Sequence, residues 1–407
     1  LKGVVKDDGA TSLSSDRGSH SYTEAYAYSD GYYDRDERMF YGFARVATTY
    51  GDHSVATVDY LNRNYFTRGM ASATSLVGPD ADGDIVTYRS GMTSVVLKDV
   101  KTVKRASTGE VLLIRAPRVF SETSRQYEPG TSEYVESRTT YGYDDAHPYG
   151  NVKDILQQSS SGIASESLHA VITYDYDIPA SDYLKQHPTS IKVTDGSGTV
   201  LRYREGDYGS SGELVALREF YADGPSDYRK HVLTWNVYGN LESITDARGH
   251  RILWNYEGDL HTFVTGITSD NTVSGGASYS SSMTWDYGLG VKLSETDENG
   301  QVMRYEYDGF GRLARIWSPY DTTMPAVAYS YDLAAFPWTA TTTNKLLYDG
   351  SDKQAIRTLI SVDGLGRALQ TAKDGEYRDG EGNRHYGWNA SGAVAYDAKG
   401  RSAAQGQ

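Results

Sequence analysis

Hydrophobic and polar residues alternate along most of this chain, in short runs separated by turns that contain glycine. Residues 21–28 place three tyrosines on one face of an extended strand, and Met303, Tyr305 and Tyr307 line one face of another. Apolar stripes with helical spacing are few and weak. The pattern therefore predicts an all-β protein made of many short strands.

A turn motif with the spacing Asp-x-x-Gly recurs between the predicted strands. In three copies the aspartates are 51 residues apart, with an aliphatic residue six places later and an aromatic residue eight places later. Related copies follow towards the C-terminus, one of them at residues 379–382, and 236–239 is a variant with Asn in place of Asp. The key positions are Asp195, Gly198 and Tyr203; Asp246, Gly249 and Trp254; Asp297, Gly300 and Tyr305; Tyr307, Asp308, Gly311 and Arg312; Asp363, Gly366 and Arg367; and Asp397, Gly400 and Arg401.

This spacing has a mechanical explanation. An aspartate at the first position of a type I turn can accept hydrogen bonds from backbone N–H groups two or three residues later, and glycine at the fourth position adopts the left-handed conformation that closes a bulged hairpin. One hairpin alone is marginally stable, so neighbouring hairpins must pair laterally. The repeats therefore predict a continuous, strongly twisted β-sheet.

Composition narrows the possible functions. The 407 residues include 35 tyrosines but only 8 phenylalanines, and the 42 glycines suit tight turns. The net charge of −14 argues against binding to nucleic acid or anionic lipid, because phosphate binding needs clustered Lys and Arg. The absence of cysteine removes disulfides and thiolate sites. No apolar run approaches the length of a membrane span.

Two segments resemble a known family. The Tyr-Asp-x-x-Gly-Arg-Leu unit at 307–313, with its relatives at 363–367 and 396–401, looks like the YD repeat of RHS proteins. Residues 30–46 are similar to a motif in the middle region of the B component of bacterial insecticidal toxin complexes and related virulence proteins, with Met39 where an acidic residue is common. The motif residues are Gly31, Tyr32, Tyr33, Asp34, Glu37, Arg38, Phe40, Gly42 and Phe43.

The resemblance implies a role. In such secreted toxins the RHS region forms a hollow β-shell that encloses a cytotoxic C-terminal polypeptide, which is released through a channel-forming partner. On this basis we expect a curved shell segment with an enclosed polypeptide, in the same chain or from a partner chain, and a channel-forming toxin component as partners. Residues 1–185 correspond to the middle-region-like segment and residues 186–407 to the YD-repeat segment, with the division near Pro179 and Pro188. No Asp-Pro dipeptide is present, so no residues of the family's self-cleaving protease are assigned.

Candidate chemistry is sparse. Asp80, Asp82 and Asp84 could gather calcium ligands, but no bidentate Glu follows, and an acidic hairpin turn is the alternative. A carboxylate cluster at residues 30–37 could serve glycoside hydrolysis, although the interleaved Arg35 and Arg38 favour a salt-bridged turn. The nine histidines show no metal-ligand spacing, and no serine lies in Gly-x-Ser-x-Gly. We expect neither a catalytic site nor a cofactor.

Three hypotheses follow from the sequence. The first is a non-enzymatic shell segment that sequesters a toxin polypeptide. The second is a cell-surface or glycan-binding adhesin that uses an exposed tyrosine face. The third is a polysaccharide-degrading enzyme, which would need two carboxylates about 5–10 Å apart in a groove.

Overall fold

The computed structural model describes residues 2–7, 21–104, 111–147, 149–176, 185–221, 227–270, 275–334, 336–346, 355–397 and 400–406. Within these residues β-strands dominate, and η2 (Ala164–Glu166) is a short 3₁₀ helix. The prediction of an all-β fold is confirmed. The strands are β1 (Gly3–Asp7), β2 (Ser21–Asp34), β3 (Met39–Tyr50), β4 (Val55–Tyr60), β5 (Ala71–Pro79), β6 (Ile85–Lys104), β7 (Val111–Tyr127), β8 (Tyr134–Tyr143), β9 (Val152–Ser159), β10 (Leu168–Tyr174), β11 (Pro188–Asp195), β12 (Val200–Tyr208), β13 (Leu214–Phe220), β14 (Tyr228–Trp235), β15 (Leu241–Thr245), β16 (Arg251–Tyr256), β17 (Val264–Asp270), β18 (Ser278–Asp286), β19 (Val291–Thr296), β20 (Val302–Tyr307), β21 (Leu313–Trp317), β22 (Val327–Asp332), β23 (Trp338–Lys345), β24 (Ala355–Val362), β25 (Ala368–Arg378), β26 (Arg384–Ser391), β27 (Val394–Tyr396) and β28 (Ser402–Gln405).

The chain divides into two compact units. The first comprises residues 1–4, 24–234 and 245–247, and the second comprises residues 5–23, 235–244 and 248–407. The sequence predicted a boundary at 185/186, where the regular repeats begin. That boundary stays a prediction. Pro179, which helped to place that division, lies outside the described residues.

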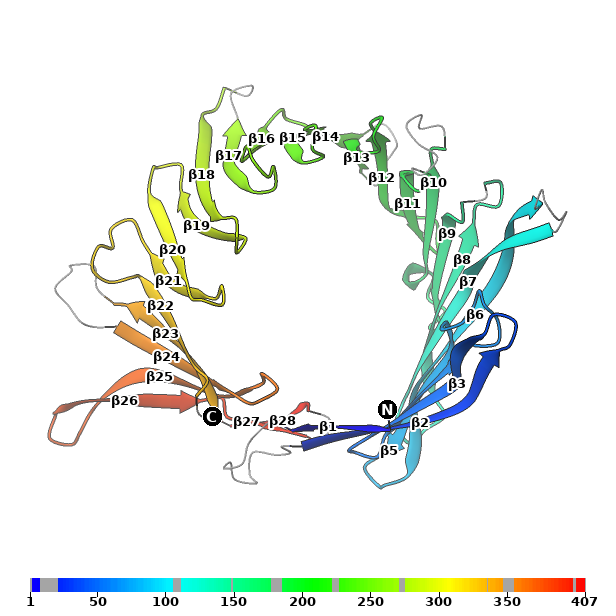
Figure 1. Ribbon diagram of the computed structural model, residues 1–407, viewed down its shortest axis with the longest axis horizontal. Coiled ribbons are helices and arrows are strands. Elements are labelled where there is room, and N and C mark those ends of the chain that lie inside the picture. Colours follow the sequence, from blue (N-terminus) through cyan, green and yellow to red (C-terminus); the bar gives the residue numbers. More distant parts are fainter. Residues whose placement is uncertain are drawn as a thin grey trace. The chain divides into compact units, whose positions relative to one another are not determined.

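Strand order follows the sequence within each unit. In the first unit the strands from β2 to β14 form one antiparallel series, in which each strand up to β13 pairs with the strand that follows it. In the second unit the same holds from β16 to β26. Consecutive strands accordingly lie side by side in Figure 1. Such local hairpin pairing is what short strands joined by tight turns allow.

Many of these hairpins carry a bulge next to the turn. The register shifts at Asp207/Tyr208 in β12, at Glu306/Tyr307 in β20 and at Ser361/Val362 in β24. A bulge places two residues of one strand opposite one residue of the next and increases the local right-handed twist. The predicted bulged, twisted hairpins are therefore present as the building unit.

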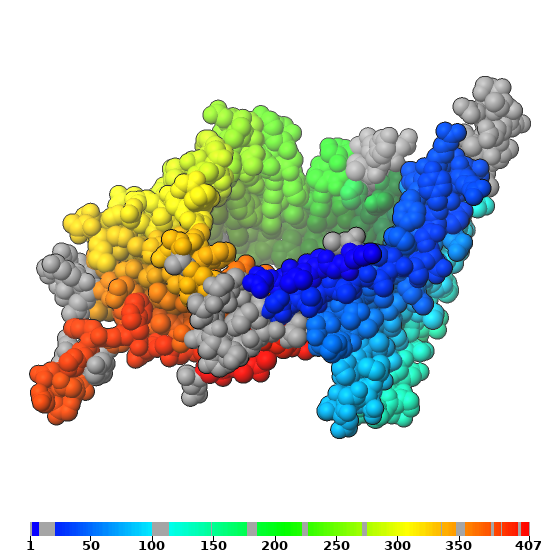
Figure 2. Space-filling model, turned by 60° about the horizontal axis from the view of Figure 1, so that its bottom comes forward, coloured from blue at the N-terminus to red at the C-terminus, as the bar shows by residue number. Residues whose placement is uncertain are grey.

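The strands that the structure describes enclose few buried hydrophobic side chains. Among the described residues the buried hydrophobic side chains are only Tyr22, Tyr41, Ala216 and Leu369, while many large apolar side chains are exposed. In the space-filling view the yellow and orange residues of the second unit form one continuous surface (Figure 2). Stability must therefore come mainly from hydrogen bonds and side-chain contacts between neighbouring strands.

Candidate functional site: the repeat turns and the polar sheet surface

One carboxylate oxygen of the aspartate organises each repeat turn. Asp297 Oδ1 accepts hydrogen bonds from the backbone N–H groups of Asn299 (2.9 Å) and Gln301 (2.7 Å), while the Gly300 N–H donates to the Asp297 carbonyl (3.0 Å). The bonded N–H groups are two and four residues after the aspartate, whereas the sequence argument expected two or three. The difference arises because Gly300, at φ +78°, turns the next N–H back towards the carboxylate.

The same contacts recur along the chain. They are present at Asp195, Asn236, Asp308, Asp363 and Asp379. In the turn at Asp397 the contact to the Arg401 N–H is present, and residues 398 and 399 lie outside the described residues. The turn glycines have positive φ angles at Gly198, Gly239, Gly249, Gly300, Gly311, Gly366, Gly382 and Gly400. Only glycine adopts a positive φ angle without steric cost, so the backbone conformation of the turn explains why glycine recurs three residues after each aspartate.

The acidic run at residues 80–84 has this turn geometry as well. Asp80 Oδ1 accepts from the N–H groups of Asp82 (3.0 Å) and Asp84 (2.9 Å), and Gly83 has φ +89°. No group of three potential ligands that could hold a metal ion occurs in the part of the chain that the structure describes. The calcium candidate of the sequence analysis is thus placed in a hairpin turn between β5 and β6.

Hydrogen bonds lower the pKa of carboxyl groups in the repeat turns. His385 Nε2 lies 2.8 Å from Asp379 Oδ2, and this contact, with backbone and side-chain donors of the turn, lowers the pKa of Asp379 to about 2. The Ser197 hydroxyl and the Thr199 N–H lower the pKa of Asp195. These carboxylates are therefore held ionised as hydrogen-bond acceptors, which is the opposite of what a general acid requires.

An aromatic residue at the end of many strands ties that strand to the one before it. The Tyr307 hydroxyl, directly before the turn aspartate, donates to the Lys292 carbonyl on β19 at 2.8 Å. Equivalent bonds are made by Tyr143, Tyr174, Tyr208, Tyr256, Trp285 and Tyr331. The sequence analysis missed this role. The signal for it was an aromatic residue immediately before a turn, but the acceptor lies on a different strand.

The arginine at the end of three repeat turns pairs with the turn aspartate, and in two of these turns it also stacks on a tyrosine of a later strand. Arg312 Nε donates to Asp308 Oδ2 (2.7 Å), and its guanidinium lies 4.2 Å from the centre of the Tyr331 ring. Arg401 pairs with Asp397 in the same way. One arginine therefore links a turn to its neighbour through both an ion pair and a cation–π contact.

The most buried version of this arrangement lies in the second unit. Asp363 is 0% exposed, and its Oδ2 accepts from Arg367 Nε at 2.6 Å. The Arg367 guanidinium lies 4.1 Å from the centre of the Tyr396 ring and 4.5 Å from that of Tyr22, and Arg367 also donates to the Tyr22 hydroxyl. Residues more than 340 positions apart in sequence thus share one contact cluster.

The aromatics that follow the three 51-residue repeats occupy strands. The Tyr203 ring stacks on Phe220 at 4.4 Å, and the Tyr305 ring lies 5.3 Å from Lys292 Nζ. Trp254 lies on β16, where it is opposite Ile267 on β17. These side chains contribute cross-strand contacts, each worth roughly 0.2–1 kcal/mol.

The toxin-family motif forms the hairpin of β2 and β3. Asp34 Oδ1 accepts from the N–H groups of Asp36 (3.0 Å) and Glu37 (2.8 Å), and Gly31 lies beneath the rings of Phe40 and Phe43. The other motif positions belong to the same hairpin: the Tyr32 ring lies at a tilt to that of Tyr41, Tyr33 is opposite Phe40, and Arg38 and Gly42 have positive φ angles. Buried Asn62 donates to the carbonyls of Asp30 and Gly42, which anchors the hairpin to the loop between β4 and β5.

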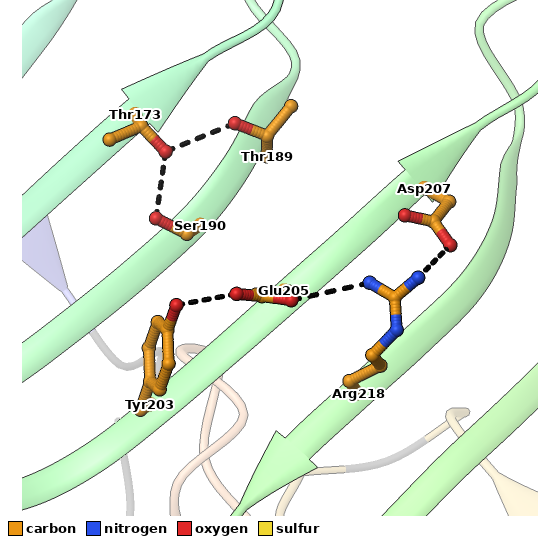
Figure 3. A network of polar contacts seen from close by, with 7 residues as sticks. All are labelled: Thr173, Thr189, Ser190, Tyr203, Glu205, Asp207 and Arg218. Carbon is orange, nitrogen blue, oxygen red and sulfur yellow. Dashed lines mark hydrogen bonds and ion pairs between the residues drawn. The ribbon is translucent and has the colours of Figure 1, made fainter. Parts of the chain in front are cut away.

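A polar network crosses β10 to β13 in the first unit (Figure 3). The Thr173 hydroxyl meets those of Thr189 (3.0 Å) and Ser190 (2.7 Å). On the next strands Tyr203 donates to Glu205, and Arg218 bridges Glu205 and Asp207. The two carboxylates thus share one arginine, and this surface is lined with hydroxyl groups and ion pairs.

Comparisons with known proteins support the resemblance found in the sequence. Residues 5–73 match the family described as the insecticide toxin TcdB middle/N-terminal region. No curated protein matches the chain. The fold matches the crystal structure of TcdB2-TccC3 with a TM-score of 0.69 at 12% identity, covering 94% of this chain and 28% of that one.

Further solved structures agree. TcdB2-TccC3-Cdc42 and the Photorhabdus luminescens Tc holotoxin pore each match with a TM-score of 0.69 at 11% identity, covering 94% of this chain and 30% of theirs. The chain thus spans less than a third of the length of the chains it matches. Among the described residues no helix is long and apolar enough to cross a membrane. The chain therefore resembles the B component of insecticidal toxin complexes, in sequence over residues 5–73 and in fold over 94% of its length.

Proposed function

We propose that this chain is a structural wall segment of a secreted bacterial toxin, which encloses and shields a cytotoxic polypeptide and has no enzymatic activity of its own. The observation that carries the proposal is the shared fold with TcdB2-TccC3 over 94% of the chain. The enclosed polypeptide belongs to the same protein or to a partner chain, and a channel-forming toxin component is the second partner.

The way in which the sheet is held together supports this role. A container needs a wall that is continuous and thin, and here neighbouring strands are joined by backbone pairing, by aromatic side chains such as Tyr307 and by arginines such as Arg312. Such a wall can extend repeat by repeat because each strand contacts mainly its neighbours, as in other repeat proteins. Stability then does not depend on a central core, which would fill the space that a cargo needs.

The surface chemistry fits sequestration better than catalysis. The carboxylates of the repeat turns are occupied by backbone N–H groups, and Glu205 and Asp207 share Arg218. Hydrolysis of a glycosidic bond needs one carboxylic acid that can give up a proton and a second free carboxylate. Several tyrosine hydroxyls, those of Tyr143, Tyr174 and Tyr307 among them, join neighbouring strands.

Limited proteolysis tests the proposal. The natural full-length protein, purified with any polypeptide that accompanies it, is treated with protease under native conditions and analysed by mass spectrometry, with a urea-denatured sample as control. We expect one segment outside the repeats to survive until the shell is denatured. Immediate digestion of every segment outside the repeats, while the repeats persist, would contradict enclosure.

A further inference from the structure

A groove crosses the strands of the first unit on one face of the sheet. It has a volume of about 580 Å³, and its lining comes from β4 to β8. From β5 to β8 the floor is one row of small residues placed directly opposite one another: Thr74 faces Gly91, Gly91 faces Ser124, and Ser124 faces Ser137. Val58 of β4, opposite Thr74, ends this row. Strand register therefore creates a channel perpendicular to the strands.

Longer side chains stand on both sides of this row. Leu76, Arg89 and Gln126 are opposite one another in the row on one side, and Thr93, Glu122 and Thr139 in the row on the other side. The two rows are four residues apart along each strand, so their backbones are separated by about 13 Å. Four strands at a spacing of about 4.8 Å give the floor a length of about 14 Å.

Gly91 has no side chain that would fill the groove. A Cβ atom at this position would lie 2.7 Å from the Thr74 hydroxyl oxygen, so a larger residue would push into the groove or displace its neighbour. The floor thus presents hydroxyl groups and backbone, which can both donate and accept hydrogen bonds without demanding one sequence.

The walls carry opposite charges. Arg89 lines one side and Glu122 the other, and the Tyr141 hydroxyl donates to Glu122 Oε2 at 2.7 Å. This bond fixes the carboxylate at the groove edge. A ligand with both charged and neutral polar groups would find partners on both walls.

The lining and the dimensions of the groove favour an extended polypeptide as its ligand. The lining contains no aromatic side chain on which a sugar could stack, and one arginine in a chain of net charge −14 is a poor match for nucleic acid. An α-helix with side chains is about 10–12 Å wide, and the wall side chains leave less than the 13 Å between backbones. An extended polypeptide advances about 3.3–3.6 Å per residue, so about four residues cover the floor.

We propose that this groove binds an extended segment of polypeptide, with the backbone of the ligand lying across β5 to β8 over Thr74, Gly91, Ser124 and Ser137. The inference rests on the proposed function, because the enclosed polypeptide is then the occupant. The hydroxyl floor hydrogen-bonds to backbone amides and carbonyls, which allows recognition of an unfolded chain with little regard to its sequence.

Fluorescence anisotropy with the full chain tests the inference. The probe is fluorescein-labelled lysozyme that has been reduced and carbamidomethylated so that it stays unfolded, compared with labelled native lysozyme of closely similar composition. We expect binding of the unfolded probe to be at least about tenfold tighter than binding of the native probe. Filling the groove with Ser124→Trp or Ser137→Trp should weaken binding of the unfolded probe by about tenfold or more.

The matched control is Ser94→Trp, which makes the same exchange on the opposite face of β6 at an exposed residue that does not line the groove, and circular dichroism checks that each variant keeps its strands. Equal binding by Ser124→Trp and Ser94→Trp, or equal binding of both probes, would overturn the inference. The proteolysis experiment tests the proposed function separately. If a segment is protected from protease but groove filling does not change probe binding, the enclosing role stands and only the groove proposal is overturned.

Discussion

Replacing Asp363 with alanine should destabilise the β24–β25 hairpin more than the same change in any half-exposed repeat turn. The side chain is 0% exposed and accepts three hydrogen bonds, from the backbone N–H groups of Leu365 and Arg367 (2.9 Å each) and from Arg367 Nε (2.6 Å). The substitution removes all three acceptor contacts.

The magnitude follows from what is left behind. The Arg367 side chain is 16% exposed, so its guanidinium would lose its carboxylate in a place where water can replace it only in part. Removing one partner of a buried ion pair costs about 3–5 kcal/mol. In the matched variant Asp297→Ala two backbone hydrogen bonds are lost near solvent, which by analogy with helix-capping residues costs about 0.5–2 kcal/mol.

Native-state hydrogen exchange read by mass spectrometry measures both variants. It reports local opening, which suits a sheet whose strands contact mainly their neighbours. Peptides from Ala355–Val362 and Ala368–Arg378 should lose at least about fivefold more protection in Asp363→Ala than peptides around residue 297 lose in Asp297→Ala, because the two costs differ by at least about 1 kcal/mol and 1.4 kcal/mol corresponds to a factor of ten. Equal losses would refute the idea that burial of this ion pair stabilises the hairpin.

Three further predictions concern the parts of the repeat. Tyr307→Phe removes one hydrogen bond between strands and should lower the free energy of unfolding by about 0.5–1.5 kcal/mol, measured by urea denaturation. Gly311→Ala forces alanine into φ +76° and should cost about 1–2 kcal/mol, whereas Gly309→Ala in the same turn, with open space and no positive φ, should be neutral or slightly stabilising. Asp379, with its pKa lowered to about 2, should stabilise its turn above pH 4 and lose that contribution as the pH falls towards 2. Hydrogen exchange around His385 should become faster over this pH range. If Asp379→Asn shows no such pH dependence, the Asp379 carboxylate is confirmed as its source.

Several local features of the fold were determined by the sequence itself. The alternation of apolar and polar residues specifies strands, and Asp-x-x-Gly specifies where they turn, because the aspartate and the glycine act on backbone atoms within four residues. The contacts of Asp297 and the conformation of Gly300 show this directly. The toxin-family motif at residues 30–46 could also be recognised from the sequence alone, and residues 5–73 match that family.

Only the tertiary structure decided which side chains meet across strands. Tyr307 reaches a carbonyl 15 positions earlier, and Arg367 contacts Tyr22 on a strand 345 positions away. The groove row of Thr74, Gly91, Ser124 and Ser137 likewise exists only because four strands pair in one register. Each bulge shifts that register by one residue, and a shift of one residue moves a side chain to the other face of the sheet. Local sequence patterns fix the period of a strand, but its alignment with a neighbour depends on the pairing of distant residues.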